Sequence, residues 1–151
     1  MVWKPRVTVA AIIERDQRFL LVEEESAYGL QINQPAGHLE ENEDLIAAVI
    51  REVREETAWQ FEPEHLVAIQ LWRRDPSTLT FLRVCFSGTC HSHDPHQALD
   101  AGVVATHWLT RDEVAAQQAR LRSPLVLVGI DEYLSGNRYP LSLLQNYLDH
   151  E

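Results

Sequence analysis

Three glutamates, Glu52, Glu55 and Glu56, are the residues whose types and spacing most clearly suggest chemistry. Successive residues of an α-helix are rotated by about 100°, so the i, i+3, i+4 spacing places the three carboxylates on one face of a helix. Like charges this close repel each other, and a hard divalent cation such as Mg²⁺ would offset the repulsion by taking carboxylate oxygens as ligands. Taken alone, the same spacing is typical of a solvated acidic face.

The residues around the acidic face favour the metal-binding interpretation. Gly37 is followed by five residues and Glu43, and seven further residues lead to Arg51-Glu52-Val53-Arg54-Glu55-Glu56. Over residues 37–59 this resembles the box of the Nudix hydrolase family, G-x5-E-x7-R-E-U-x-E-E-x-G-U, where U is a bulky apolar residue. Six such positions coincide by chance about once in 10⁷ windows or less. We therefore expect a single Nudix hydrolase domain over residues 1–151.

The resemblance implies a role for each residue of the box. The metal-binding carboxylates correspond to Glu52, Glu55 and Glu56, and a backbone carbonyl ligand corresponds to that of Gly37. Arg51 corresponds to the arginine that orients a box glutamate through charge-assisted hydrogen bonds. Glu43 corresponds to a structural acid near the start of the helix, where a negative charge also suits the helix dipole.

The implied reaction is metal-assisted hydrolysis. Mg²⁺, for which Mn²⁺ is a substitute, neutralises charge on phosphate oxygens and lowers the pKa of a bound water that attacks phosphorus. We expect Arg51, Glu52 and Glu55 to carry catalysis, with Glu52 or Glu55 as base toward the water. Many family members also recruit a carboxylate from outside the box. Asp100 precedes Ala101, where relatives often have Glu, and is either that carboxylate or an inert surface residue.

One position departs from the box. Its second glycine is Ala58 here, followed by Trp59 at the last apolar position. If a positive φ is required at this point, alanine costs on the order of 1 kcal/mol relative to glycine. Because the position supplies no catalytic group, we expect a local adjustment of the backbone and an intact site.

Segments outside the box resemble the NudJ-type phosphatases of the same family. They include residues 33–40, 81–83, 121–125 and 138–141. The resemblance implies release of phosphate from nucleoside tri- and diphosphates, or from thiamine-pathway pyrophosphates such as hydroxymethylpyrimidine diphosphate and thiamine pyrophosphate. Two alternatives stay open: a pyrophosphatase for ADP-ribose or another nucleoside diphosphate linked to a further group, and a non-catalytic binding or regulatory module with the Nudix fold.

Three residues are candidates to contact the rest of the substrate. Arg83 and Arg73 are cations in an acidic protein and suit phosphate oxygens, and Trp72 suits stacking on a heterocycle. Each also has a plainer interpretation. Arginines commonly lie at the surface or in ion pairs of little energy, and an aromatic residue in a strand commonly belongs to the core.

The apolar pattern predicts the elements that position these residues. Strands are expected at 7–13, 19–22, 66–72, 79–86 and 103–109. Helices are expected at 43–57 with Asn42 as N-cap, after Thr110 with a capping box to Glu113, and from about 124 to 134. This order predicts an α/β (α+β) protein, a Nudix-like α/β/α sandwich with a central mixed β-sheet flanked by helices.

Composition narrows the partners. The formal net charge of −10 disfavours binding to nucleic acid, which needs many Lys and Arg contacts to phosphate. No apolar run is long enough to span a membrane, no signal peptide is recognised, and two cysteines are too few for a secreted disulfide framework. Even within one strand, Cys85 and Cys90 would point to opposite faces. We expect a cytoplasmic monomer or homodimer that acts on a small phosphorylated metabolite and binds neither nucleic acid nor membrane.

Overall fold

The strands form one mixed sheet. The computed structural model describes residues 1–149, in which eight strands are ordered β3-β2-β1-β6-β5-β8, with β4 paired to β1 and β7 paired to β2. Their bounds are β1 Arg6–Arg15, β2 Arg18–Ser26, β3 Gly29–Asn33, β4 Ala36–His38, β5 Gln60–Trp72, β6 Phe81–His91, β7 Val103–Thr110 and β8 Tyr139–Pro140. β1 and β6 are parallel, and the other pairs are antiparallel.

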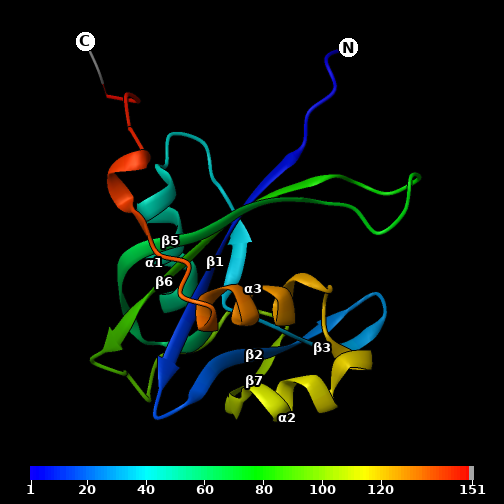
Figure 1. Ribbon diagram of the computed structural model, residues 1–151, viewed down its shortest axis with the longest axis vertical. Helices are drawn as coiled ribbons and strands as arrows, with labels where there is room; N and C mark the ends of the chain where they lie inside the picture. Colours follow the sequence, from blue (N-terminus) through cyan, green and yellow to red (C-terminus); the bar gives the residue numbers. More distant parts are fainter. Residues whose placement is uncertain (150–151) are drawn as a thin grey trace.

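The sheet is splayed into two halves that meet at β1. β1 pairs with β6 from Arg6 to Ile13, but it pairs with β2 only at Glu14 and Arg15. The strands β2, β3 and β7 therefore diverge from β1, β5 and β6, and they lie below them in Figure 1. This divergence leaves space between the half-sheets on the side away from the β1–β2 turn.

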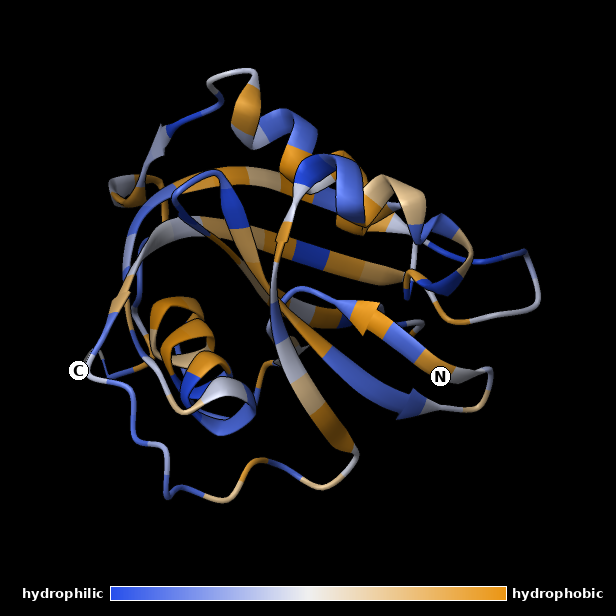
Figure 2. Cartoon of the chain, turned by 90° about the horizontal axis from the view of Figure 1, so that it is seen from below, coloured by the Kyte–Doolittle hydropathy of each residue, from blue (hydrophilic) through white to orange (hydrophobic). Residues whose placement is uncertain are grey.

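Helices cover both faces of the sheet. They are α1 Leu45–Thr57, α2 Arg111–Ala116 and α3 Leu125–Leu134, with short 3-10 turns at Gln118–Arg120 and Leu141–Leu143. Val9, Ala11 and Ile13 of β1 share a core cluster with α1, whereas Ala10 and Ile12 share a second cluster with α3. β1 is thus buried on both sides, which explains its uninterrupted apolar sequence. The predicted α/β/α sandwich is confirmed, and Figure 2 shows α1 and α3 on opposite sides of the strands.

The N-terminus of α1 differs from the prediction. Asn42 was expected as the N-cap, but it has a positive φ of 64° in the preceding turn, whereas an N-cap requires extended backbone. Asp44 has that conformation, and its side chain accepts a hydrogen bond from the N–H of Ala47 at 2.7 Å. The helix therefore begins at Leu45, two residues after the predicted start. The capping box of Thr110 and Glu113 is present as predicted.

All five predicted strands are longer than predicted, and three strands, β3, β4 and β8, were missed. β5 begins at Gln60 and β6 ends at His91, and these two residues pair with each other. Pro63 lies within β5 beside a register shift, where proline is tolerated. β3 and β4 have five and three residues, too few to display a period in the sequence.

The two cysteines lie on opposite faces of β6, as expected. Cys85 belongs to the core cluster beneath α3, and Cys90 belongs to the cluster beneath α1. Both thiols are free and buried. Within residues 1–149, no helix is both long enough and apolar enough to cross a membrane.

Candidate active site

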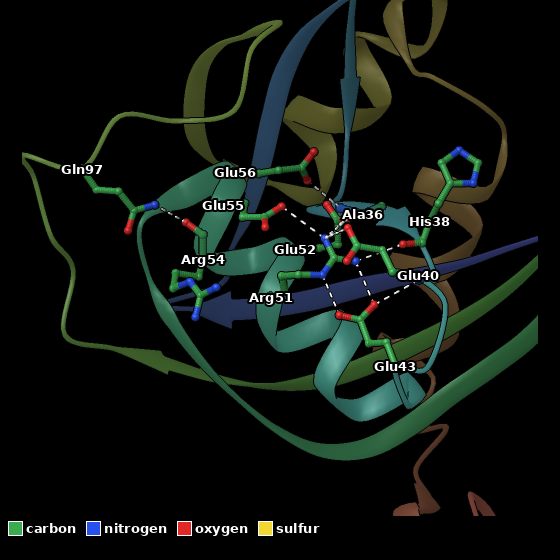
Figure 3. Close-up of polar contacts among 10 residues, drawn as sticks. All are labelled: Ala36, His38, Glu40, Glu43, Arg51, Glu52, Arg54, Glu55, Glu56 and Gln97. Atoms are coloured by element: carbon green, nitrogen blue, oxygen red, sulfur yellow. Dashed lines mark hydrogen bonds and ion pairs between the residues drawn. The ribbon is translucent and has the colours of Figure 1, made fainter. Parts of the chain in front are cut away.

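Arg51 is the centre of a hydrogen-bond network on α1 (Figure 3). Its Nε and Nη2 donate to the two carboxylate oxygens of Glu43 at 2.6 and 2.9 Å, and Nη2 also donates to the His38 carbonyl at 3.0 Å. Nη1 donates to Glu52 at 2.8 Å and to Glu55 at 3.1 Å. The hydrogen bond from Arg51 lowers the pKa of Glu43. One guanidinium therefore holds three box glutamates in place and attaches α1 to the end of β4.

Three carboxylates converge at this network. Glu52, Glu55 and Asp100 each contribute one oxygen, and these three oxygens all lie within 4.8 Å of one another. Glu52 is buried, Glu55 is half-buried and Asp100 is exposed. The backbone N–H of Asp100 donates to the Glu55 carbonyl at 3.0 Å. The structure thus brings together two predicted ligands and the acid outside the box, and in the part of the chain that it describes this is the one such cluster.

The cluster fits a divalent cation. Carboxylate oxygens are the ligands that Mg²⁺ prefers. Burial raises the pKa of Glu52, Arg51 opposes this rise, and the charges of Glu55 and Asp100 add to it. A bound cation would offset that repulsion. Gly37 borders the cluster so closely that a Cβ there would lie 2.2 Å from the Glu52 carboxyl group, so only glycine lets the backbone approach in this way.

Glu56, the third predicted metal ligand, is held differently. Its Oε1 accepts a hydrogen bond from the N–H of Ala36 at 2.8 Å, which ties α1 to the start of β4. Burial raises the pKa of Glu56 to about 9, and the negative charges of Glu24, Glu52 and Asp100 act in the same direction. Glu56 therefore lies deeper than Glu55 and outside the group of three oxygens.

Ala58 adopts the conformation that the box glycine suggested. Its φ is 63° and its ψ is 16°, in the left-handed region, and it caps the C-terminus of α1. Its N–H donates to the Arg54 carbonyl at 2.9 Å. The expected cost for alanine therefore applies, and the helix still ends with a hydrogen-bonded cap.

A cavity of about 600 Å³ adjoins the carboxylate cluster, and β4 forms part of its wall. This volume lies within the range of small-molecule sites. The cavity lies between the two half-sheets, since β1 and β6 line it on one side and β2 and β3 on the other. Its wall consists of Thr8, Glu24, Tyr28, Asn33, Ala36, Gly37, His38, Trp72, Arg74, Ser77, Thr78, Leu79, Phe81, Arg83, Arg122, Ser123 and Leu125.

Aromatic rings form the outer part of the cavity wall. Trp72 and Phe81 face each other across β5 and β6, with ring centroids 6.2 Å apart and planes 30° apart. The guanidinium of Arg74 lies 4.5 Å from the ring of Tyr28 and 5.7 Å from that of Trp72. Trp72 is half-buried and lines the cavity rather than the core. A planar heterocycle would find stacking partners here.

Arg83 is a buried cation on the cavity wall. It is 7% exposed, and its Nη2 donates to the side-chain oxygens of Gln34 at 2.6 Å and Asn33 at 3.3 Å. Its Nε has no hydrogen-bond partner, and within residues 1–149 it makes no ion pair. Burial lowers the pKa of Arg83. A buried charge that is not paired is costly, so an unpaired guanidinium on the cavity wall favours a role in binding a ligand.

Arg73, which was predicted to contact the substrate, does not line the cavity. It is exposed and is absent from the cavity wall, which Arg74 joins instead. In extended chain, residues two apart share a side, so Arg74 lies on the same side as Trp72. This parity was available in the sequence.

Several cavity residues were not predicted. Asn33 and Arg122 lie in segments that carry the family resemblance, but neither was singled out. Glu24 and Tyr28 carry no local signal, because their position depends on how β2 and the following turn face β6. They become candidates only through the fold.

The fold and this site define the class of the protein. Residues 4–127 match the NUDIX domain family, so the chain belongs to the Nudix hydrolases, which act on phosphorus-containing acid anhydrides. The phosphatase NudJ of Escherichia coli K12 is 38% identical over 145 residues, which cover 96% of this chain and 94% of NudJ.

Solved structures agree with this assignment. A Nudix hydrolase from Nitrosomonas europaea is 49% identical, with a TM-score of 0.93 over 96% of this chain and 99% of that one. The Nudix domain of Shewanella oneidensis NrtR, solved in complex with ADP ribose, has a TM-score of 0.70 and covers 89% of each chain. At 20% identity, that likeness shows the fold alone.

Proposed function

We propose that this protein is a Mg²⁺-dependent phosphatase of nucleoside tri- and diphosphates, of thiamine-pathway pyrophosphates such as hydroxymethylpyrimidine diphosphate and thiamine pyrophosphate, or of both. The supporting observation is that Gly37 borders both the carboxylate cluster and the cavity. A substrate whose phosphates lie at Glu52 and Glu55 would therefore extend its organic part toward Trp72. The identity to phosphatase NudJ over most of both chains supports the same class of reaction.

The box residues take distinct parts in the proposed reaction. Glu52, Glu55, Glu56, Asp100 and the Gly37 carbonyl would hold Mg²⁺, or Mn²⁺ in its place. When bound, the ion supplies positive charge to phosphate oxygens and lowers the pKa of water. Arg51 keeps the carboxylates of Glu52 and Glu55 in position, and one of these two receives the proton of the attacking water. Glu43 keeps Arg51 in position.

The organic part of the substrate would occupy the cavity. Trp72 offers a ring for stacking, worth about 1–3 kcal/mol for a base. Arg83 offers a guanidinium, which carries only donors, to oxygen or nitrogen acceptors. Arg74 takes the place that the sequence suggested for Arg73, because it is the arginine on the cavity wall.

The proposal treats residues 1–151 as one domain of a cytoplasmic enzyme, monomeric or homodimeric, that binds neither nucleic acid nor membrane. The segment beyond the matched region joins the same sheet, since Tyr139 and Pro140 of β8 pair with Leu66 and His65 of β5. The acidic balance of the chain favours a small substrate over a nucleic acid.

A substrate panel tests the proposal. Nucleoside tri- and diphosphates, hydroxymethylpyrimidine diphosphate, thiamine pyrophosphate and ADP-ribose are incubated with and without Mg²⁺, and orthophosphate and pyrophosphate are measured separately. We expect Mg²⁺-dependent orthophosphate from at least one of the first three groups. Cleavage of ADP-ribose alone would favour the nucleoside-diphosphate alternative. Absence of turnover with every compound would favour a binding module.

A further inference from the structure

Glu24 lies on the cavity wall beside a β-bulge. β2 pairs regularly with β7 from Arg18 to Glu23, which faces Ala105, but the next residue, Glu24, faces Val103. The extra residue of this bulge is Val104 of β7, so β2 keeps its alternation and Glu24 shares a side with Leu20 and Val22. Glu24 lines the cavity, whereas its neighbour Glu25 is exposed and does not.

Glu24 of β2 and Arg83 of β6 line the cavity from its two sides. Asn33 accepts a hydrogen bond from Arg83 at 3.3 Å. Burial raises the pKa of Glu24, and the Asn33 side chain and the charge of Arg83 oppose this rise. The Glu24 side chain is 18% exposed and pairs with Arg122 at 3.2 Å. The cavity is therefore lined by a carboxylate acceptor and by a guanidinium, which carries only donors and makes no ion pair within residues 1–149.

The part of the cavity near Arg83 is continuous with its aromatic part, formed by Phe81 and Trp72. Arg83 and Phe81 are two residues apart on β6, so they share a face about 7 Å apart along the strand, and Phe81 stacks on Trp72. A heterocycle that stacks on these rings has its edge directed along the wall toward Arg83 and Glu24. Recognition of that edge needs a donor opposite Glu24 and an acceptor opposite Arg83.

We propose that Glu24 and Arg83 select substrates whose heterocycle carries an amino group beside a ring nitrogen. Adenine, cytosine and 4-aminopyrimidines present this donor–acceptor edge, with the amino group donating to Glu24 and the ring nitrogen accepting from Arg83. Uracil and hypoxanthine present a carbonyl beside a ring N–H, which places an acceptor against the Glu24 carboxylate. This inference rests on the proposed function, since it specifies the substrate of the same site.

The comparison of CTP with UTP tests the inference. These nucleotides have the same sugar and phosphates and differ at the edge in question, so effects on the metal site cancel in their ratio. We expect kcat/KM of the wild type to favour CTP by about 10-fold or more, because a buried acceptor left without a donor is costly. Glu24→Gln should bring the CTP:UTP ratio to within about threefold of one, since an amide both donates and accepts. Glu25→Gln is the matched control and should keep the wild-type ratio.

The outcomes separate the inference from other roles of Glu24. If Glu24→Gln lowers turnover of CTP and UTP equally, Glu24 acts in catalysis or folding and the inference is overturned. A wild type without preference for CTP overturns it as well. If Glu24→Gln does not fold, Glu24→Asp, which withdraws the carboxylate by one methylene, should lower kcat/KM for CTP more than for UTP.

Failure of the proposed function is distinguishable from failure of the inference. If the wild type releases no phosphate from either nucleotide, the proposed function fails. The CTP and UTP dissociation constants, measured by calorimetry with Mg²⁺, then carry the test. A preference of about 10-fold for CTP that disappears in Glu24→Gln supports the selection, and equal constants in the wild type contradict it.

Discussion

The carboxylate cluster and the cavity beside it are built in opposite ways. Two acids of the cluster lie on one turn of α1 and are held by a single arginine, and only Asp100 arrives from elsewhere in the chain. The cavity wall draws on β1, β2, β3, β4, β6 and the segment before α3. The proposed metal site is therefore compact in sequence, whereas the proposed substrate cavity depends on the whole fold. Variants in the cluster should therefore lower kcat, whereas variants in the cavity should raise KM.

The largest effect is expected in the cluster. Glu55→Gln and Glu56→Gln should each lower kcat by on the order of 100-fold or more for every substrate, because the charge stabilisation supplied by the metal is lost with its ligands. Thermal unfolding should change little. Glu41→Gln, an exposed acid before the helix, is the control for loss of one charge. Near-normal turnover in both variants would remove the basis for a metal site on α1.

Asp100 tests whether the cluster extends beyond the box. Asp100→Asn should weaken apparent affinity for Mg²⁺ by about 10- to 100-fold, in the range found for perturbed metal sites, since its oxygen lies within 4.8 Å of those of Glu52 and Glu55. The measurement is the activity as a function of Mg²⁺ concentration. Asp112→Asn on α2, whose side chain is 96% exposed, is the control. Identical Mg²⁺ dependence in wild type and Asp100→Asn would identify Asp100 as an inert surface residue.

A change at the aromatic wall should affect binding rather than chemistry. Trp72→Ala should raise KM for nucleotides by about 10-fold while kcat changes less, because stacking on a base contributes about 1–3 kcal/mol. Leu71→Ala is the matched control, since Leu71 is 71% exposed and points to the other side of β5. A fall in kcat with unchanged KM would contradict the separation between cluster and cavity.

The smallest effect is expected at Ala58, the C-cap of α1. Ala58→Gly should raise the free energy of unfolding by up to about 1 kcal/mol, because glycine adopts a φ of 63° without steric cost. The gain is partly offset by the loss of a buried methyl group, since Ala58 is 2% exposed. Urea unfolding measures it, and turnover should stay unchanged. Destabilisation would show that the methyl group contributes more than the strain costs.

The sequence predicted the fold and the family because both depend on local patterns. The apolar run at 7–13 and the helix at 45–57 are visible as periodicities, and the box residues lie within 23 positions. The N-cap was placed at Asn42 because the sequence does not distinguish it from Asp44; only the backbone angles do. β3, β4 and β8 were missed because each is too short to display a period, and β4 and β8 also pair with strands far away in the chain.

The cavity could be predicted only in part, for a related reason. Trp72 and Arg83 were visible as residue types that suit a heterocycle and an acceptor. The choice of Arg73 over Arg74 ignored the parity of the extended chain. Glu24 required knowledge of which side of β2 borders the cavity, and that depends on how β2 lies relative to β6, about sixty residues further along the chain.

The contacts between the loop before β7 and the end of α1 have a consequence for how this enzyme tolerates change. The Gln97 side chain donates to the Arg54 carbonyl at 2.6 Å (Figure 3), and the Asp100 N–H donates to the Glu55 carbonyl at 3.0 Å, so this loop is held against the last turn of α1. Insertions and deletions should accordingly be accepted at the exposed residues 91–93 and rejected at 97–100. We therefore expect related enzymes to vary in the length of this loop only at residues 91–93.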